Sequence, residues 1–490
     1  MRALKQLLNS SSFGSAKYLG RLAPTPAPFH GILRVHGHRL PPVSVLRPNF
    51  IPFHHIEART FATNGTSNAK SDGSHRSYSR SRRALRNIFL YFLLPYTSYA
   101  LYVSFSAFRE VQVRNEECSR IEADNVINHE GTLCKYKPLR VLSRFENPFD
   151  EYRIQTIYEF FFNRIVELFD RSRGGIPSDP LEMSRIMPVH KPDWTGVSID
   201  TPRVIEHKIV TDYSRETHGS RKGDADIPVY NTWLGQSCNY VVYNGLKVIT
   251  DPIFSDHLIN KYLGPKRITG MPCTVDEVPT PDVILVSHNH PDHLDYTSLK
   301  KWGKSNVLWI VPKGMGLFMR AWRVENFVEL SWWETCELTK GDDKYQVSCT
   351  PAMHWSGRYV YDTNQSLWCS FMLSHHNKPI MFHAGDTGYV NDLFKRISHH
   401  CGDGVKLALL PCGQYCPEWH QKPRHIGPSE VIQVMNDMKA QNVLGVHWGT
   451  FILSGEPFLE PKQKLEALSE QNGTLSRCYC PELGKTIRFG

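Results

Sequence analysis

An apolar stretch lies near the start of the chain, at residues 87–108 (NIFLYFLLPYTSYALYVSFSAF). Its 22 residues carry no formal charge, and about 20 apolar residues are enough to cross the hydrocarbon core of a bilayer. Pro95 is expected to kink such a helix without preventing a span. The stretch therefore predicts one transmembrane helix at 87–108, and a buried or interfacial helix is the alternative.

A second pattern follows at 151–169, where apolar side chains recur at helical spacing: Ile154, Ile157, Tyr158, Phe161, Phe162, Ile165, Val166 and Phe169. It predicts an amphipathic helix that packs on a domain. Because so many of these side chains are aromatic, a membrane-facing role is a second interpretation. We expect residues 109–224 to form a connecting segment around this helix, with 171–224 rich in loops.

Beyond residue 225 the pattern changes to short apolar runs rich in β-branched residues. These runs are Tyr240–Tyr243, Val248–Thr250, Val283–Val286, Val307–Val311, Val347–Thr350, Ile380–Phe382, Leu407–Leu410 and Val443–Val446. Helical stretches such as Pro428–Ala440 lie between some of them. Strands that alternate with helices predict an α/β domain over 225–490, in which sheets carry helices on their outer faces.

The distribution of charge separates the start of the chain from the rest. The whole chain has a net charge of +9, which by itself suggests an anionic partner. The first 108 residues carry 14 basic residues against two acidic ones, Glu57 and Asp72, which leaves a net charge of −3 on the remainder. A nucleic-acid-binding groove is therefore not expected in the domain.

The N-terminal region has the composition of a targeting sequence. Residues 1–56 contain no Asp or Glu, and Arg59-Thr60-Phe61-Ala62 is similar to sites cut by matrix-processing peptidases. We predict a mitochondrial transit peptide at 1–61 and a basic polar linker at 62–86, with a disordered basic tail as the alternative. Five arginines precede the apolar stretch (Arg76, Arg80, Arg82, Arg83 and Arg86). The positive-inside rule then predicts an inner-membrane protein whose domain faces the intermembrane space.

All 12 cysteines follow the apolar stretch, from Cys118 to Cys480. Their spacing lacks the paired C-x2-C pattern of a structural zinc site. Most are expected to be buried thiols, and disulfides are left open.

The densest group of polar side chains follows the apolar run Val283–Val286. The next residues, Ser-His-Asn-His-Pro-Asp-His at 287–293, supply three imidazoles and a carboxylate. Imidazole with carboxylate favours zinc, iron or manganese over magnesium or calcium. His354, Asp386 and His447 each follow a later apolar run. Because α/β folds build their sites at strand ends, these residues predict a metal centre.

This order of residues resembles the dinuclear zinc site of the metallo-β-lactamase superfamily, and within it the N-acylphosphatidylethanolamine-hydrolysing phospholipase D family. The supporting segments are HNHPDHLD at 288–295, HW at 354–355, AGDTGY at 384–389 and VHWGTF at 446–451. Further similar pieces are PVHKP at 188–192, LGPKR at 263–267, CTVDE at 273–277, LPCGQY at 410–415 and LEP at 459–461. The resemblance covers roughly residues 145–490 and implies an αβ/βα sandwich.

The resemblance also implies two zinc ions per subunit and the residues that hold them. One ion would be held by His288, His290 and His354, the other by Asp292, His293 and His447, and Asp386 would bridge both. It places Asp251 behind the ligands as a buttress and His425 beside the active site. The chain departs from the family at Gln236, where relatives usually have His, which leaves the role of this loop in doubt.

The implied reaction is the hydrolysis of N-acyl phosphatidylethanolamine to phosphatidic acid and an N-acylethanolamine, with hydroxide at a dinuclear metal site attacking phosphorus. Asp292 and His425 are the expected catalytic residues, and Tyr389 and Tyr415 are expected to contact the phosphate or the lipid head. Another membrane-facing hydrolase, such as a lactonase or esterase, is the first alternative, and a metal-bearing membrane scaffold without turnover is the second. The oligomeric state is left open between a monomer and a homodimer.

Overall fold

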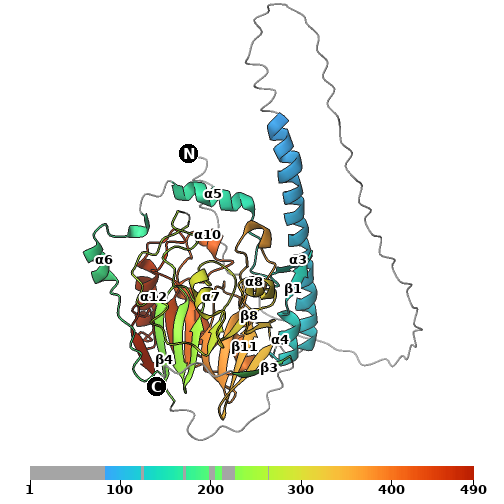
Figure 1. The fold of residues 1–490 in the computed structure, drawn as a ribbon. Coiled ribbons are helices and arrows are strands. Elements are labelled where there is room, and N and C mark those ends of the chain that lie inside the picture. The colour runs from blue at the N-terminus through green and yellow to red at the C-terminus, as the bar shows by residue number, and fades with distance from the viewer. Residues whose placement is uncertain (1–82, 123–125, 169–172, 198–204, 212–226, 263) are drawn as a thin grey trace, which may run out of the picture. The chain divides into compact units, whose positions relative to one another are not determined.

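A computed structural model of the chain describes residues 83–122, 126–168, 173–197, 205–211, 227–262 and 264–490. The predicted transit peptide at 1–61 and most of the predicted linker at 62–86 lie outside these residues. All described residues belong to one compact unit. Figure 1 shows this unit as a pair of stacked sheets with helices on the outside.

The first sheet has seven strands and mixes two pairing directions. Its spatial order is β17 (Thr486–Phe489), β4 (Val229–Gly235), β5 (Cys238–Tyr243), β6 (Leu246–Thr250), β7 (Val283–Leu285), β8 (Leu308–Pro312) and β9 (Phe327–Leu330). The pairs from β17 to β6 are antiparallel, and those from β6 to β9 are parallel.

The second sheet has eight strands, and its parallel pairs lie at the end that begins with β16. Its order is β16 (Cys478–Tyr479), β15 (Asn442–Val446), β14 (Leu407–Pro411), β13 (Lys378–His383), β12 (Ser370–His375), β11 (Asp343–Thr350), β10 (Thr335–Lys340) and β3 (Glu206–Val210). Strands β16 to β13 are parallel, and the rest pair antiparallel. A separate two-stranded ribbon is formed by β1 (Leu139–Val141) and β2 (Arg144–Glu146).

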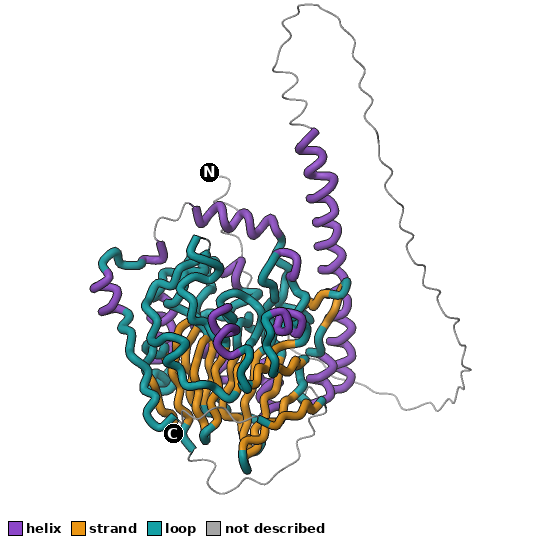
Figure 2. Tube along the Cα trace, in the orientation of Figure 1, coloured by secondary structure: helices purple, strands orange, loops and turns teal. Residues whose placement is uncertain are grey.

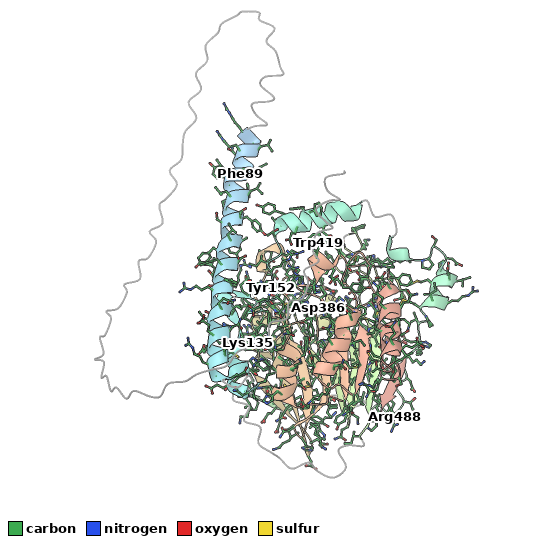
Figure 3. All side chains as sticks on the ribbon, turned by 180° about the vertical axis from the view of Figure 1, so that it is seen from behind. Phe89, Lys135, Tyr152, Asp386, Trp419 and Arg488 are labelled. Atoms are coloured by element: carbon green, nitrogen blue, oxygen red, sulfur yellow. The ribbon has the colours of Figure 1, made fainter. Side chains whose placement is uncertain are left out.

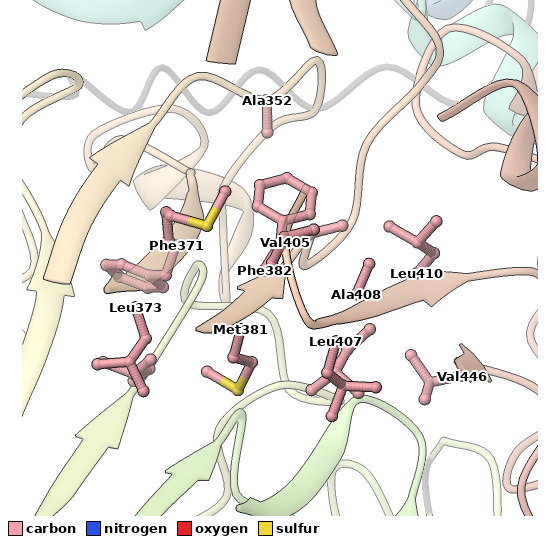
Figure 4. Close-up of a cluster of buried hydrophobic side chains, with 14 of the residues drawn as sticks. Ala352, Phe371, Leu373, Met381, Phe382, Val405, Leu407, Ala408, Leu410 and Val446 are labelled. Atoms are coloured by element: carbon pink, nitrogen blue, oxygen red, sulfur yellow. The ribbon is translucent and has the colours of Figure 1, made fainter. Parts of the chain in front are cut away.

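The alternation of side chains along the strands explains why both faces of each sheet are apolar. On β8, Leu308 and Ile310 point into the core shared with the other sheet, whereas Trp309 and Val311 point outward. Successive side chains of a strand face opposite sides, so a sheet covered on both faces needs continuous apolar runs. Figure 4 shows part of the core between the sheets, with Phe371, Phe382 and Leu410 among its members.

Helices cover the outer faces. On the seven-stranded sheet, α7 (Tyr296–Trp302) and α8 (Gly316–Ala321) contribute to the outer core. On the eight-stranded sheet, side chains of α9 (Leu393–Cys401), α11 (Pro428–Asp437) and α12 (Glu460–Gln471) join the main core. The remaining described elements are α4 (His129–Lys135), η2 (Arg173–Gly175), α6 (Pro180–Ile186), η4 (Val360–Asp362) and α10 (Glu418–Gln421). The predicted αβ/βα sandwich is confirmed.

Each apolar run that the sequence predicted to be a strand coincides with one, except that Val286 and Val307 lie one residue outside β7 and β8; the predicted helix at Pro428–Ala440 corresponds to α11, which ends at Asp437. The packed sandwich extends upstream of the predicted boundary at residue 225. Strand β3 pairs with β10, and Tyr136, Phe145 and Phe149 belong to the main core. Part of the predicted connecting segment is thus built into the fold.

A continuous helix runs over Arg83–Ile121 and is long and apolar enough to cross a membrane. It comprises a short helical start, a π-helical turn η1 (Phe89–Leu93) and α3 (Leu94–Ile121). Pro95 follows the π turn, and the helix continues through it. Proline has no N–H to donate and its ring crowds the carbonyl one turn earlier, a conflict that a wider turn relieves.

The second half of this helix packs on the domain. Val103 is buried in a cluster with Leu139 and Val141 of the ribbon. The Arg114 guanidinium donates to the backbone carbonyls of Lys137 and Pro138. In Figure 3, Phe89 lies on the part of the helix away from the sheets and Lys135 lies beside its other end.

Just past the helix, Glu122 forms a buried ion pair with Arg396 of α9, with 2.6 Å between Oε1 and Nη1. A buried pair of this kind is costly to break because the remaining charge is left without a partner. Together with the Val103 cluster, this ion pair fixes α3 to the two-sheet domain.

The amphipathic helix, α5, begins later than the pattern at 151–169 predicts, at Ile157 (Ile157–Leu168). Thr156 accepts a hydrogen bond from the backbone N–H of Glu159 and so acts as the N-cap. The residues before it are engaged by the domain: Tyr152 packs against the main core and Arg153 donates to the carbonyl of Trp419. These contacts keep the chain extended up to the cap.

All 12 cysteines are free thiols, and ten of them are buried. This agrees with the expectation of buried thiols.

Candidate metal centre

The polar residues singled out in the sequence lie at one edge of the sandwich, where strands of both sheets end. Asp251 follows β6, His288–His293 follow β7, His354 follows β11, Asp386 follows β13 and His447 follows β15. Figure 2 shows loops gathered beyond these strand ends, on the side where α5 lies. The fold therefore brings residues almost 200 positions apart to one place.

A first group consists of His288, His290, His354 and Asp386, all of them buried. His290 Nδ1 lies 2.7 Å from His288 Nε2 and 3.4 Å from His354 Nε2. Asp386 Oδ2 lies 3.6 Å from His354 Nε2 and 4.0 Å from His288 Nε2. Three ring nitrogens and a carboxylate oxygen thus converge on one point.

A second group consists of Asp292, His293, Asp386 and His447, also buried. His293 Nε2 lies 3.1 Å from Asp386 Oδ2 and 3.2 Å from His447 Nε2. His447 Nε2 lies 3.2 Å from Asp292 Oδ2 and 3.1 Å from Asp386 Oδ1. Asp386 therefore belongs to both groups: its Oδ2 lies near His288, His354 and His293, and its Oδ1 lies near His447.

These groups fit metal ions. Four ligands placed 2.0–2.1 Å from a tetrahedral zinc lie about 3.3 Å from one another, close to the separations in the second group. In the first group, protons alone cannot satisfy three imidazole nitrogens that face each other, whereas a cation accepts all their lone pairs. The donor set of imidazole and carboxylate suits zinc, iron or manganese.

The imidazoles of the first group are kept neutral. Burial, reinforced by neighbouring imidazoles, lowers the pKa of His288 and His354 well below the usual value. Burial likewise lowers the pKa of His290 to about 4. A neutral imidazole is the form that binds a metal, so these nitrogens are ready to act as ligands at neutral pH.

The second group has the opposite electrostatics. Burial alone would lower the pKa of His293 and of His447. The neighbouring carboxylates, Asp386 foremost, outweigh burial and raise the pKa of His293 well above its usual value and that of His447 to about 9. In turn, despite burial, the adjacent imidazoles hold the pKa of Asp292 and of Asp386 well below the usual range. A cation entering this group must displace protons that it does not meet in the first.

Asp251 lies behind the ligands. One of its oxygens accepts from Ser287 N at 2.7 Å, and the other lies 2.8 Å from His293 Nδ1 and 2.8 Å from His383 Nε2. A carboxylate at the far nitrogen of a histidine fixes its tautomer and orients the near nitrogen. Ser287 and His383 were not singled out from the sequence, although Ser287 opens the 287–293 motif and His383 lies between the run Ile380–Phe382 and the segment at 384–389.

Two further contacts come from parts of the chain that no motif pointed to. Asn147 Nδ2 donates to the backbone carbonyl of His354 at 2.7 Å. Arg358 donates to the carbonyls of Asn289 and Leu294 and so holds both ends of the histidine loop. Neither residue has a local sequence signal, because each acts on a backbone atom distant in the chain.

The predicted catalytic and substrate residues lie at different distances from the cluster. His425 is buried, and its Nδ1 lies 3.9 Å from Asp386 Oδ2 without a hydrogen bond to any described residue. The Tyr389 hydroxyl donates to Asp437 and the Tyr415 hydroxyl to Glu460, each at 2.8 Å. Both tyrosine hydroxyls are thus engaged outside the two groups, and their contact with substrate stays a prediction.

Comparison with known proteins identifies the family. A family model described as a beta-lactamase superfamily domain matches residues 247–448. The mitochondrial N-acyl-phosphatidylethanolamine-hydrolyzing phospholipase D of Saccharomyces cerevisiae is 60% identical over 417 residues, which cover 84% of this chain and 89% of the yeast protein. The chain belongs to this family.

More distant similarities extend the picture. N-acyl-phosphatidylethanolamine-hydrolyzing phospholipase D 1 of Caenorhabditis elegans is 30% identical over 345 residues, which cover 68% of this chain and 88% of the worm protein. Among solved structures, an isothiocyanate hydrolase from Delia radicum gut bacteria matches with a TM-score of 0.43 and 18% identity, over 53% of this chain and 99% of that one.

Replacing Asp386 tests whether it joins the two groups. Asp386→Asn keeps the shape of the side chain and removes the charge that both groups share. We therefore expect the amount of metal bound at each of the two groups to fall. The fall in affinity should exceed the roughly 10–100-fold that loss of an outer partner costs. Metal content is measured by mass spectrometry on purified protein. Asp276→Asn, at an exposed carboxylate paired with Lys301, is the matched control. An Asp386→Asn protein with unchanged metal content would show that Asp386 is no ligand.

Proposed function

We propose that this chain is a membrane-anchored, zinc-dependent phosphodiesterase. It hydrolyses N-acyl phosphatidylethanolamine to phosphatidic acid and an N-acylethanolamine. The observation that carries the proposal is the pair of buried ligand groups joined by Asp386. The 60% identity to a protein named for this activity supports the substrate.

A phosphodiester anion repels an incoming hydroxide, so its hydrolysis needs compensating positive charge and a nucleophile at neutral pH. Two zinc ions held by the two groups would supply both. Asp292, which accepts a hydrogen bond at Oδ2, is the residue we assign to orienting the attacking water and receiving its proton.

His425 is the residue we assign to the phosphate. Burial lowers its pKa to about 3, so the imidazole is neutral and carries one ring proton to donate. Its buried Nδ1 makes no hydrogen bond to a described residue, which leaves it free for a phosphate oxygen beside Asp386. A protonated histidine would compete with the metal cations for the same anion, and a neutral one does not.

The activity is tested on the purified full chain in detergent with N-acyl phosphatidylethanolamine, a p-nitrophenyl phosphodiester and a lactone as substrates. We expect release of N-acylethanolamine, measured by mass spectrometry, and its loss on chelation with recovery on adding zinc. Asp386→Asn protein serves as the inactive control. Turnover of the lactone without turnover of the lipid would instead favour a lactonase, and metal binding without any turnover would favour the scaffold.

We propose further that the helix over Arg83–Ile121 anchors the enzyme in the bilayer. Its side chains from Leu85 to Leu94 are exposed, with Tyr91 and Phe92 at about 70%. From Val103 onward one face is buried against the domain. The free apolar stretch from 87 to 102 is about 24 Å long, shorter than the roughly 30 Å of a bilayer core.

Helix α5 adds a second apolar surface beside this stretch. Its first backbone N–H, at Ile157, donates to the Tyr96 hydroxyl at 2.8 Å, and the Tyr158 and Thr97 hydroxyls lie 2.7 Å apart. Helix α5 therefore meets the stretch part-way along it, at Tyr96 and Thr97. Four of its apolar side chains are 41–59% exposed: Ile157, Tyr158, Phe161 and Phe162. We assign this face to the bilayer interface, where aromatic side chains are favoured.

Replacing Phe161 and Phe162 by Ser tests this docking in vesicles that contain the full chain. Removing two half-buried aromatic side chains from the lipid interface is expected to cost about 2 kcal/mol of docking free energy. The kcat/KM should then fall about 10-fold or more for lipid in the bilayer and stay unchanged for a water-soluble short-chain analogue. Leu317→Ser, at a 78% exposed position on α8, is the matched control. Equal losses on both substrates would contradict membrane docking.

We place the protein in the mitochondrial inner membrane with its domain in the intermembrane space. The name of the yeast relative supports the mitochondrion, and the arginines before the apolar stretch support the orientation. Protease added to mitoplasts should digest the domain, whereas protease added to intact mitochondria should not. A domain that survives rupture of the outer membrane would reverse the orientation.

A further inference from the structure

Gln236, in the loop whose role the sequence left open, is built into the metal centre. It occupies the turn between β4 and β5 with a left-handed backbone (φ 50°) and is 1% exposed. Its side-chain Nε2 donates to Asp292 Oδ2 at 2.9 Å and lies 2.8 Å from His447 Nε2. These two atoms belong to the second ligand group and not to the first.

The backbone of Gln236 is fixed just as firmly. Its carbonyl accepts from His447 N at 2.9 Å and from Trp233 Nε1 at 2.8 Å. Its N–H donates to Thr450 Oγ1 at 2.7 Å. A positive φ is strained for a non-glycine residue, and these contacts hold Gln236 in that conformation. The side chain is therefore presented to Asp292 and His447 by a rigid frame.

The chemistry of an amide suits this position. One proton on Nε2 serves Asp292 Oδ2, and when His447 is neutral the other can serve the lone pair of His447 Nε2. Half a turn of the terminal amide exchanges Nε2 for the carbonyl oxygen Oε1, which is a neutral ligand for a cation. The Gln236 side chain can thus present its Nε2 to Asp292 Oδ2 and His447 Nε2, or present its Oε1 to a cation that lies between these two atoms.

We propose that Gln236 is a positioning residue for the second metal position, setting its affinity independently of the first. The inference rests on the proposed function only in that the two groups bind metal. Because Gln236 contacts Asp292 and His447 and none of His288, His290 and His354, a change at this position should alter one binding step and leave the other.

Two substitutions with opposite expected effects separate this role from a structural one. Gln236→Ala removes the contacts and should weaken one of the two binding steps about 10–100-fold, the usual cost of losing an outer partner of a metal site. Gln236→Glu keeps the reach and supplies an anionic oxygen, so it should strengthen the same step. A purely structural role would make both variants bind more weakly or neither.

The measurement is a titration of the metal-stripped full chain in detergent with zinc against a chelator of known affinity, repeated with cobalt to follow its visible absorption. His354→Ala should weaken the step that Gln236→Ala leaves unchanged, which assigns the steps to the two groups. Gln365→Ala, at an exposed glutamine that donates to the Tyr361 carbonyl, is the matched control.

Opposite shifts in one step support the proposal. The proposal is contradicted if Gln236→Ala and Gln236→Glu both bind metal with wild-type affinity, or if both bind it more weakly. It is also contradicted if either variant changes the two binding steps equally. A chain that binds no metal contradicts the proposed function as well. A chain that binds two ions with the expected shifts, yet does not release N-acylethanolamine, contradicts the proposed function alone.

Discussion

The metal centre concentrates six imidazoles and three carboxylates, counting His383 and Asp251, in a buried place at the edge of the two sheets. Burying one unpaired charge costs several kcal/mol, so the charges must be matched in number and geometry. Asp386 and Asp251 do this from opposite sides, one between the two groups and one behind them. Much of the fold serves this requirement: two sheets end at the same edge, and every ligand stands at a strand end.

The asymmetry between the two groups follows from the same matching. The first group has three imidazoles for one carboxylate and is kept neutral by burial. The second has two imidazoles beside two carboxylates and holds protons, most firmly on His293. Metal binding at the second group is therefore coupled to proton release, and it is there that Gln236 is placed. The two groups therefore differ in how they receive a cation.

The sequence predicted the parts of this arrangement that are local. Continuous apolar runs identified the buried strands because both faces of each sheet are covered, and the 288–293 motif and the histidines after later runs identified the residues that the fold gathers into the two groups. Asn147, Arg358 and the contacts of Gln236 were beyond prediction, since each depends on which distant backbone or side chain the fold brings near. The depth of the anchor was also hidden. Val103 and Phe105 are equally apolar in the sequence, yet one is buried in the domain and the other exposed, and hydropathy does not distinguish lipid from a protein core.

That shared helix has a consequence for how the enzyme can be handled. Because Val103, Arg114 and Glu122 hold α3 to the ribbon and to α9, the helix and the two-sheet domain are not separable modules joined by a linker. Trimming the chain at residue 109, where the uncharged apolar stretch ends, would strip the cover from Leu139 and Val141. A version of the enzyme made for work in solution must keep the helix from Val103 onward, and only the exposed apolar side chains of the helix can be replaced with polar ones without loss of this packing.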